Sequence, residues 1–315
     1  MGPAQMVTQQ LEVFFLRALP ISVVVPVFNE QDRLLECLLA LKQQRSSVGI
    51  WELIIVDNGS TDQSREIAET FAAQGCWRSN DQLVSVRVID EPVRDVYIAR
   101  NKAIAESQGD LIAFTDSHCR VAPDWLECLT SELNADTGIV VGSLEAEERA
   151  SLAARLYTLY HNERSQLIFS EEKRPYYYGQ CANMIVRHQL FDSLGPFPSL
   201  PLAGDTEILH RYMAADSSAK IRYTLKAKVT RLSVLSFKEM LGKLRNYGKY
   251  TQALSRSSKL QTISLGTRTR VYLRCARKLP ALHRIYLLGV LTVGLIGFNI
   301  GRTQWAMKLA WSRTS

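Results

Sequence analysis

Residues 21–144 alternate short apolar runs with longer amphipathic segments. Leucines recur at helical spacing between positions 34 and 41, and further helices are expected through 67–71, near 96–108 and near 124–134. The apolar runs between these helices have the length and composition of buried strands: 21–28, 51–56, 84–89, 111–115 and 139–144. This alternation predicts an α/β fold in which a mostly parallel sheet is flanked by helices.

A second apolar region lies near the C-terminal end. Residues 285–301 contain no charged side chain, and this run is at the short edge of the ~20 residues that cross a bilayer as a helix. Trp305 and Trp311 follow it, and five cations precede it: Arg268, Arg270, Arg274, Arg277 and Lys278. Cationic flanks with nearby tryptophans are typical of an interfacial segment, so we expect membrane association, with a buried C-terminal helix as the alternative.

Charge divides the chain unevenly. Residues 1–216 carry 18 Lys and Arg against 30 Asp and Glu, whereas residues 217–315 carry 20 against the single Glu239. A basic tail on an acidic body indicates an anionic partner such as phospholipid, a lipid-linked phosphate or nucleic acid. We expect an anionic membrane surface and no nucleic acid. The chain is divided into an N-terminal segment (1–19), an α/β domain (20–256) and a basic helical extension (257–315).

Several common classes of protein are disfavoured by what the sequence lacks. The six cysteines form no Cys-x-x-Cys pair, which argues against a structural zinc site or a disulfide framework and favours a reducing, cytoplasmic setting. Residues 11–16 contain Glu12 and do not form a convincing signal-peptide core. Neither a Gly-x-Gly-x-x-Gly turn after the first strand nor a Gly-Lys-Ser/Thr loop is present, so a dinucleotide dehydrogenase or a P-loop enzyme is not expected.

Polar residues follow three of the expected strands. Asn29, Asp57 and Asp116 come where the first, second and fourth strands end. In a doubly wound sheet the carboxyl ends of the strands form the ligand site, so these side chains are expected to converge. Asp116 and His118 stand at i and i+2, where extended backbone points both side chains the same way, and a carboxylate with an imidazole can hold a divalent cation. By itself this triplet is also compatible with an ordinary turn.

An ordered set of motifs carries a family resemblance. Its segments are VPVFNE at 25–30, IIVDNGSTD at 54–62, ARNKAI at 99–104, GD at 109–110, TDSH at 115–118, GQCANMIVR at 179–187 and GDTE at 204–207. In these motifs, over residues 20–256, the chain resembles the catalytic domain of glycosyltransferase family 2, which has the Rossmann-like GT-A fold. The resemblance implies transfer of a sugar from a nucleotide-sugar donor.

The resemblance also implies roles at the donor site. Asp57 would accept a hydrogen bond from the uracil N3–H, which favours a UDP-sugar, and Pro26 and Asn29 would line the base and ribose pocket. Arg100 would contact the nucleotide or pin Asp116, with a plain surface salt bridge as the alternative. The complete set of expected nucleotide-sugar-binding residues is Pro26, Asn29, Glu30, Asp57, Asn58, Arg100, Asp116, Ser117, Gln180 and Arg231.

The metal motif departs from the commonest family pattern, Asp-x-Asp. Asp116-Ser117-His118 is similar instead to the Asp-x-His of polypeptide N-acetylgalactosaminyltransferases. Imidazole in place of a second carboxylate favours Mn²⁺, with Mg²⁺ as the alternative. Many relatives supply a later His, but this chain reads Val229-Thr230-Arg231 there, so Arg231 is expected to assist the diphosphate.

The motif at 204–207 contains the expected catalytic base. Inversion at an anomeric carbon needs a carboxylate that takes the proton of the acceptor hydroxyl, and Asp205 stands at the family's base position. Glu207 is expected to cap the helix that follows. Two local structures are also predicted: a half-buried strand at Tyr176–Tyr178, with a sugar-binding edge as the alternative, and a turn at Tyr247-Gly248 after a basic helix.

Together these observations predict an inverting, metal-assisted glycosyltransferase at the cytoplasmic face of the membrane. It would move one sugar from a UDP-sugar to a polysaccharide precursor, a lipid-linked glycan or a small-molecule acceptor. The Gln-x-x-Arg-Trp motif of processive synthases is lacking, which favours a single transfer. The alternatives are a retaining GT-A transferase acting on a peptide or small molecule, a catalytically silent nucleotide- or membrane-binding protein, and a soluble cytoplasmic location.

Overall fold

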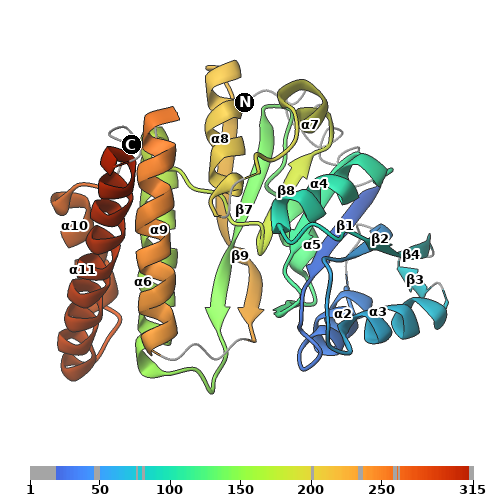
Figure 1. Ribbon diagram of the computed structural model, residues 1–315, viewed down its shortest axis with the longest axis horizontal. Coiled ribbons are helices and arrows are strands. Elements are labelled where there is room, and N and C mark those ends of the chain that lie inside the picture. Colours follow the sequence, from blue (N-terminus) through green and yellow to red (C-terminus); the bar gives the residue numbers. More distant parts are fainter. Residues whose placement is uncertain are drawn as a thin grey trace, which may run out of the picture.

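The computed structural model describes residues 19–45, 50–75, 77–79, 82–199, 202–232, 237–257, 261 and 263–311. These residues form one nine-stranded sheet with the order β3-β4-β2-β1-β5-β8-β7-β9-β6 (Figure 1). The strands are β1 (Ile21–Val27), β2 (Ile50–Asp57), β3 (Trp77–Ser79), β4 (Gln82–Asp90), β5 (Leu111–Thr115), β6 (Cys119–Val121), β7 (Thr137–Ala146), β8 (Asn183–Arg187) and β9 (Lys220–Arg231).

Four of the eight neighbouring strand pairs run parallel and four run antiparallel. β1 pairs in parallel with β2 and β5, β2 with β4, and β7 with β9. β8 runs antiparallel between β5 and β7, and the edge strands β3 and β6 are also antiparallel to their partners. The predicted α/β fold with a sheet flanked by helices is confirmed; the sheet is mixed, with its parallel pairs concentrated in β4-β2-β1-β5. β8 was not predicted, because its apolar core is only Met184 to Val186 and its burial comes from pairing with two distant strands.

Helices cover both faces of the sheet. They are α2 (Leu34–Lys42), α3 (Ser64–Ala73), α4 (Val96–Glu106), α5 (Trp125–Thr130), α6 (Leu152–Ser170), α7 (Gln189–Leu194), α8 (Gly204–Ala215), α9 (Phe237–Ser257), α10 (Leu265–Ala276) and α11 (Ala281–Trp311), with a 3-10 turn, η1 (Arg174–Tyr176). Successive side chains of a strand point to opposite faces, which divides the core in two. Val23 and Val25 of β1 pack in the cluster that contains α2, α3 and α5 residues, and Val24 packs in the cluster that contains α4 and α8 residues.

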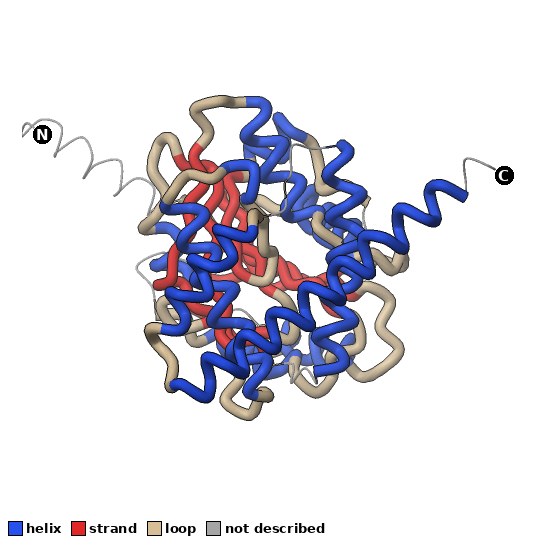
Figure 2. The backbone as a smooth tube through the Cα atoms, turned by 90° about the vertical axis from the view of Figure 1, so that its left-hand side faces the viewer, coloured by secondary structure: helices blue, strands red, loops and turns tan. Residues whose placement is uncertain are grey.

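The C-terminal helices pack beside α6 rather than on the central strands. Figure 2, viewed from that side, shows α11 running diagonally across the front of the molecule with the strands behind. Two glycines allow α9 and α11 to meet closely: a Cβ on Gly248 would lie 2.0 Å from the Phe298 carbonyl oxygen, and one on Gly301 would lie 1.9 Å from that of Arg245. The predicted turn at Tyr247-Gly248 is therefore wrong, because Gly248 lies inside a continuous helix and is needed for this contact.

Two further local predictions differ from the structure. The segment Tyr176–Tyr178 is not a strand, because η1 ends at Tyr176 and the chain then continues as a loop. The helix expected near 124–134 ends at Thr130, where the Thr130 hydroxyl donates to the Leu126 carbonyl oxygen at 2.9 Å. Side-chain hydrogen bonds of this kind compete with the regular backbone pattern near a helix end.

Helix α11 is the one described helix that is long and apolar enough to cross a membrane, over Ala281–Gln304. Only 17% of the most apolar window of this helix is buried in the protein. Its exposed apolar side chains are Leu282, Ile285, Tyr286, Leu288, Val293, Ile296 and Ile300. The helix therefore has one face that packs on the protein and one apolar face that no described residue covers.

Candidate active site

A cavity of about 540 Å³ opens at the carboxyl ends of the central strands. One end is formed by residues that follow β1, β2 and β5, and the other lies between α6, α9 and α11. Ten of the residues singled out from the sequence line it: Pro26, Glu30, Asn58, Arg100, Asp116, Ser117, His118, Gln180, Asp205 and Arg231. Of the three strand-end residues expected to converge, Asn29, Asp57 and Asp116, only Asp116 is among the residues that line the cavity.

Asp116 is held in place by Arg100. Asp95 caps the first turn of α4 by accepting from the Tyr97 and Ile98 amides, and Arg100 then lies one turn further along the helix. The buried Arg100 guanidinium donates to Asp116 Oδ1 at 2.7 Å. Burial opposes ionisation of Asp116, but the charge of Arg100, helped by His118 and Arg231, keeps the pKa of this carboxyl below its usual value. Of the two sequence alternatives for Arg100, the structure shows the one that pins Asp116.

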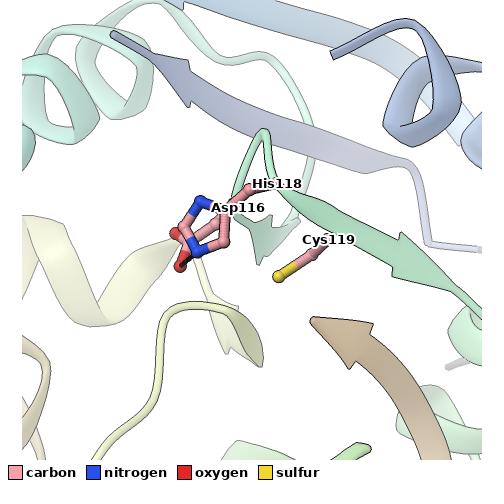
Figure 3. Close-up of side chains that lie close together, drawn as sticks. All are labelled: Asp116, His118 and Cys119. Carbon is pink, nitrogen blue, oxygen red and sulfur yellow. Dashed lines mark ion pairs between the residues drawn. The ribbon is translucent and has the colours of Figure 1, made fainter. Parts of the chain in front are cut away.

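His118 stands beside this pair. Figure 3 shows the side chains of Asp116 and His118 together on the loop that joins β5 to β6, with Cys119 at the start of β6. His118 Nε2 lies 3.9 Å from Asp116 Oδ2, and His118 Nδ1 lies 3.4 Å from Glu30 Oε1. A carboxylate on the far nitrogen orients a metal-binding imidazole and raises its basicity, so Glu30 is placed to support His118.

The donor atoms fit a divalent cation in part. Ligand atoms of Asp116, His118 and Cys119 all lie within 4.8 Å of one another. Asp116 and His118 supply the oxygen and nitrogen that manganese accepts. Burial raises the pKa of the Cys119 thiol to about 12, so it is protonated at neutral pH and is a poor ligand. The two residues identified from the sequence are therefore the better pair.

Asp205 is the second residue of α8 and is oriented by three donors. Its Oδ1 accepts from the Tyr97 hydroxyl at 3.2 Å and from the Thr206 amide at 2.9 Å, and its Oδ2 accepts from the Cys181 amide at 3.2 Å. Because a carboxylate offers about four acceptor positions, these bonds leave about one for a substrate hydroxyl. Burial raises the pKa of Asp205 above its usual value although Arg100 opposes this effect. A raised pKa makes the carboxylate a stronger base.

Two predicted donor-site residues do not line the cavity. Asp57 is buried, and its Oδ1 accepts from the Ser60 amide at 3.2 Å. Asn29 adopts a left-handed conformation (φ 52°) and its Oδ1 accepts from the Thr61 amide at 2.8 Å. The Asn29 contact ties the loop after β1 to the loop after β2. Asn58 donates from Nδ2 to the Glu91 carbonyl oxygen at 2.9 Å and is in the cavity wall.

Several cavity residues were not identified from the sequence. Tyr97 contacts Asp205 across 108 positions of sequence, and a Cβ on Gly204 would lie 2.9 Å from its ring. His161 and Arg164 reach the cavity from α6, and Tyr247 reaches it from α9. Tyr97 lies two residues before the motif at 99–104, and this proximity is a usable signal. No such signal marks His161 and Arg164, because α6 lies outside the motifs.

A mixed α/β sheet with a carboxylate and imidazole at the strand ends, and a further carboxylate on a separate helix, is the arrangement of the GT-A fold. The sequence model of glycosyl transferase family 2 matches residues 22–195, more than half of the chain. The chain belongs to this family.

Curated relatives agree with this membership. Glycosyltransferase AglE of Haloferax volcanii is 30% identical over 187 residues, which is 58% of this chain and 58% of AglE. The putative teichuronic acid biosynthesis glycosyltransferase TuaG of Bacillus subtilis is 33% identical over 107 residues, 34% of this chain and 39% of TuaG. The chain thus matches well under two thirds of the length of these relatives.

Solved structures share the fold. The mannosyltransferase PcManGT of Pyrobaculum calidifontis, in complex with GDP-Man and Mn²⁺, has a TM-score of 0.56 at 14% identity, over 96% of this chain and 93% of that one. Glucosyl-3-phosphoglycerate synthase of Mycobacterium tuberculosis, with Mn²⁺, UDP-glucose and phosphoglyceric acid, has a TM-score of 0.53 at 19% identity, over 78% and 83%. At these identities the similarity establishes the GT-A fold and not the substrate.

Proposed function

We propose that the protein is an inverting glycosyltransferase that moves one sugar from a UDP-sugar to an acceptor in glycan biosynthesis. The observation that carries the proposal is that Asp116 and His118 of the β5–β6 loop and Asp205 of α8 line one cavity at the strand ends. Membership of family 2 and solved relatives that bind nucleotide-sugars with Mn²⁺ support it.

The donor would lie at the β1–β2–β5 end of the cavity. Pro26 and Asn58 line this end of the cavity. Asp57, next to Asn58 in sequence, is assigned to bind the uracil base of the donor. Asp116 and His118 would hold a divalent cation, with Mn²⁺ favoured over Mg²⁺. Such an ion neutralises charge on a departing diphosphate. Arg100 keeps Asp116 ionised for this task, and Arg231, whose Nε is buried without a partner, is placed for a diphosphate oxygen.

Asp205 would act as the base. An acceptor hydroxyl loses its proton to the open position on Asp205 as its oxygen bonds to the anomeric carbon. The bond from that carbon to the diphosphate oxygen breaks, and the electron pair leaves with UDP. Attack opposite the leaving group inverts the anomeric configuration. Tyr97 and the Cys181 amide hold the carboxylate in this orientation.

The acceptor would be lipid-linked or a polysaccharide precursor at the cytoplasmic membrane face. The support is the uncovered apolar face of α11 next to cations of α10 and Arg284. An apolar face with cationic neighbours is attracted to anionic lipid both by burial and by charge.

Turnover of a panel of UDP-sugars with Mn²⁺ and a lipid-phosphate or glycan acceptor tests the proposal. We expect release of UDP for one sugar, and a product whose anomeric configuration, read by NMR, is opposite to that of the donor. Retention would assign the chain to the retaining class and remove Asp205 as the base. Absence of turnover with every UDP-sugar, under conditions where UDP binds, would favour a silent binding protein.

A further inference from the structure

The cavity contains cations beyond those assigned to the donor. Arg164 of α6 and Arg268 of α10 line it at the end away from β1. Neither forms an ion pair with a carboxylate in the part of the chain that the structure describes. The Arg164 Nε is buried and has no hydrogen-bond partner, and Arg268 Nε donates only to the Ile263 carbonyl oxygen, at 3.2 Å.

The other arginines of α10 are paired, which makes Arg268 unusual on that helix. Glu163, next to Arg164 in sequence, accepts from Arg274 Nε at 3.1 Å and from Lys278 Nζ at 2.5 Å. Arg270 pairs with Glu171. Glu163 and Glu171 are therefore already engaged by other cations.

Aromatic side chains lie beside Arg164. The Arg164 guanidinium lies 4.3 Å from the centre of the Tyr178 ring, and the Tyr178 hydroxyl bonds to Ser165 and lies 3.3 Å from His161 Nδ1. Burial and the charges of Arg164 and Arg231 lower the pKa of His161, so its imidazole is neutral. Burial and the charge of Arg164 lower the pKa of Arg268, while Tyr160 opposes this effect.

Two adjacent arginines in a cavity need an anion. Burying an uncompensated charge is expensive, and arginine does not lose its proton to avoid this cost. Arginine pairs are suited to phosphate, because their fork of N–H donors matches its oxygens. Beyond them the cavity wall becomes apolar, with Leu244 of α9 and Leu291, Leu295 and Phe298 of α11.

We propose that Arg164 and Arg268 bind a phosphate group of the acceptor, at a subsite separate from the donor diphosphate, with any apolar chain of that acceptor lying against the cavity wall that α9 and α11 form. That the bound phosphate compound is the acceptor substrate rests on the proposed function. The subsite itself can be tested without turnover.

The test is calorimetric titration of the full-length protein, saturated with UDP, with farnesyl phosphate, farnesol and glycerol 3-phosphate. We expect farnesyl phosphate to bind, and Arg164→Gln and Arg268→Gln each to weaken it about 10-fold or more, the loss of one charge-assisted contact. Matched controls are Arg155→Gln on the exposed side of α6 and Arg270→Gln on α10, which should leave the affinity unchanged. If Arg164→Gln does not fold, Arg164→Lys and the Arg268 variant carry the comparison.

Each outcome decides the matter. Glycerol 3-phosphate binding as tightly as farnesyl phosphate, with the same loss in both variants, supports the phosphate subsite with a water-soluble ester as its source. Farnesol binding as well as farnesyl phosphate overturns the proposal, as does an unchanged affinity in both variants or no binding of either phosphate. Equal loss of UDP affinity in the variants also overturns it, because the arginines would then belong to the donor site. Failure of UDP itself to bind counts against the proposed function, and the phosphate titration still stands.

Discussion

The Arg100 guanidinium, 4% exposed, donates to Asp116 Oδ1 at 2.7 Å and connects the α4 core to the strand-end loop. Because the pair is largely removed from water, loss of one partner leaves an uncompensated charge. This relationship determines both the charge of the proposed metal ligand and the position of its carboxylate.

Replacement of Arg100 should therefore destabilise the protein and remove activity. We expect Arg100→Gln to lower the free energy of unfolding by about 3 kcal/mol, measured by urea denaturation. The control is Arg120→Gln, whose ion pair with Glu36 is exposed and should contribute less than about 1 kcal/mol. Equal stability of the two variants would contradict the account of Arg100.

The proposed metal site predicts different effects on Mn²⁺ binding when His118 and its neighbour Cys119 are replaced. We expect His118→Ala and Asp116→Asn to abolish Mn²⁺ binding in a titration followed by electron paramagnetic resonance. Cys119→Ala should bind Mn²⁺ as the unaltered protein does, because the Cys119 pKa of about 12 keeps its thiol protonated. Loss of Mn²⁺ in Cys119→Ala, with the fold intact, would make the thiol a ligand.

Replacement of Asp205 should lower activity but should not lower stability at pH 7. Asp205→Asn is expected to lower kcat by roughly 100-fold or more, the usual contribution of a general base. Folding raises the pKa of the Asp205 carboxyl, so the folded state holds its proton more tightly than the unfolded state does. The stability that this proton contributes is lost as the pH rises through the pKa of the folded state. Asp205→Asn should thus be at least as stable as the unaltered protein at pH 7 and no more stable at pH 3. A thermal melt at both pH values measures this, and a lower stability at pH 7 alone would contradict it.

Two glycines of α9 should respond in opposite directions to the same substitution. Gly248→Ala places a Cβ 2.0 Å from the Phe298 carbonyl oxygen, so α9 and α11 must separate and the melting temperature should fall. Gly242→Ala meets nothing within 4 Å and should stabilise the helix by up to about 1 kcal/mol through higher helix propensity. Calorimetric melts of the two variants make the comparison, and a stabilised Gly248→Ala would show that the close contact is wrong.

Membrane association should depend on the uncovered face of α11. Leu282→Asp with Ile285→Asp, at residues 75% and 70% exposed, is expected to abolish co-sedimentation with vesicles that contain phosphatidylglycerol while leaving the melting temperature unchanged. Deletion of residues 281–315 is a harsher version, since it also removes the support of α9. If the unaltered protein does not co-sediment with these vesicles, the proposed membrane location is wrong.

Local pattern was sufficient for five of the nine strands, β1, β2, β4, β5 and β7, and for most of the helices. Strands β1, β2, β4 and β5 are buried runs of Val, Ile and Leu, and their alternation with amphipathic helices admits few other architectures. It failed where the structure of a segment depends on a distant partner: Asn183–Arg187 becomes a strand by pairing with β5 and β7, and Gly248 continues a helix because Phe298 approaches it.

By itself the sequence determined the fold class and the family, and it identified Asp116, His118 and Asp205, because these depend on residue type at strand ends and in short motifs. Tertiary structure decided which partner each of them has. Arg100 rather than solvent holds Asp116, Tyr97 orients Asp205 from 108 positions away, and Arg164 and Arg268 line the same cavity without an ion pair to any described carboxylate. The reason is physical: the charge and orientation of a side chain depend on burial and on neighbours in space, and segments far apart in the sequence supply both.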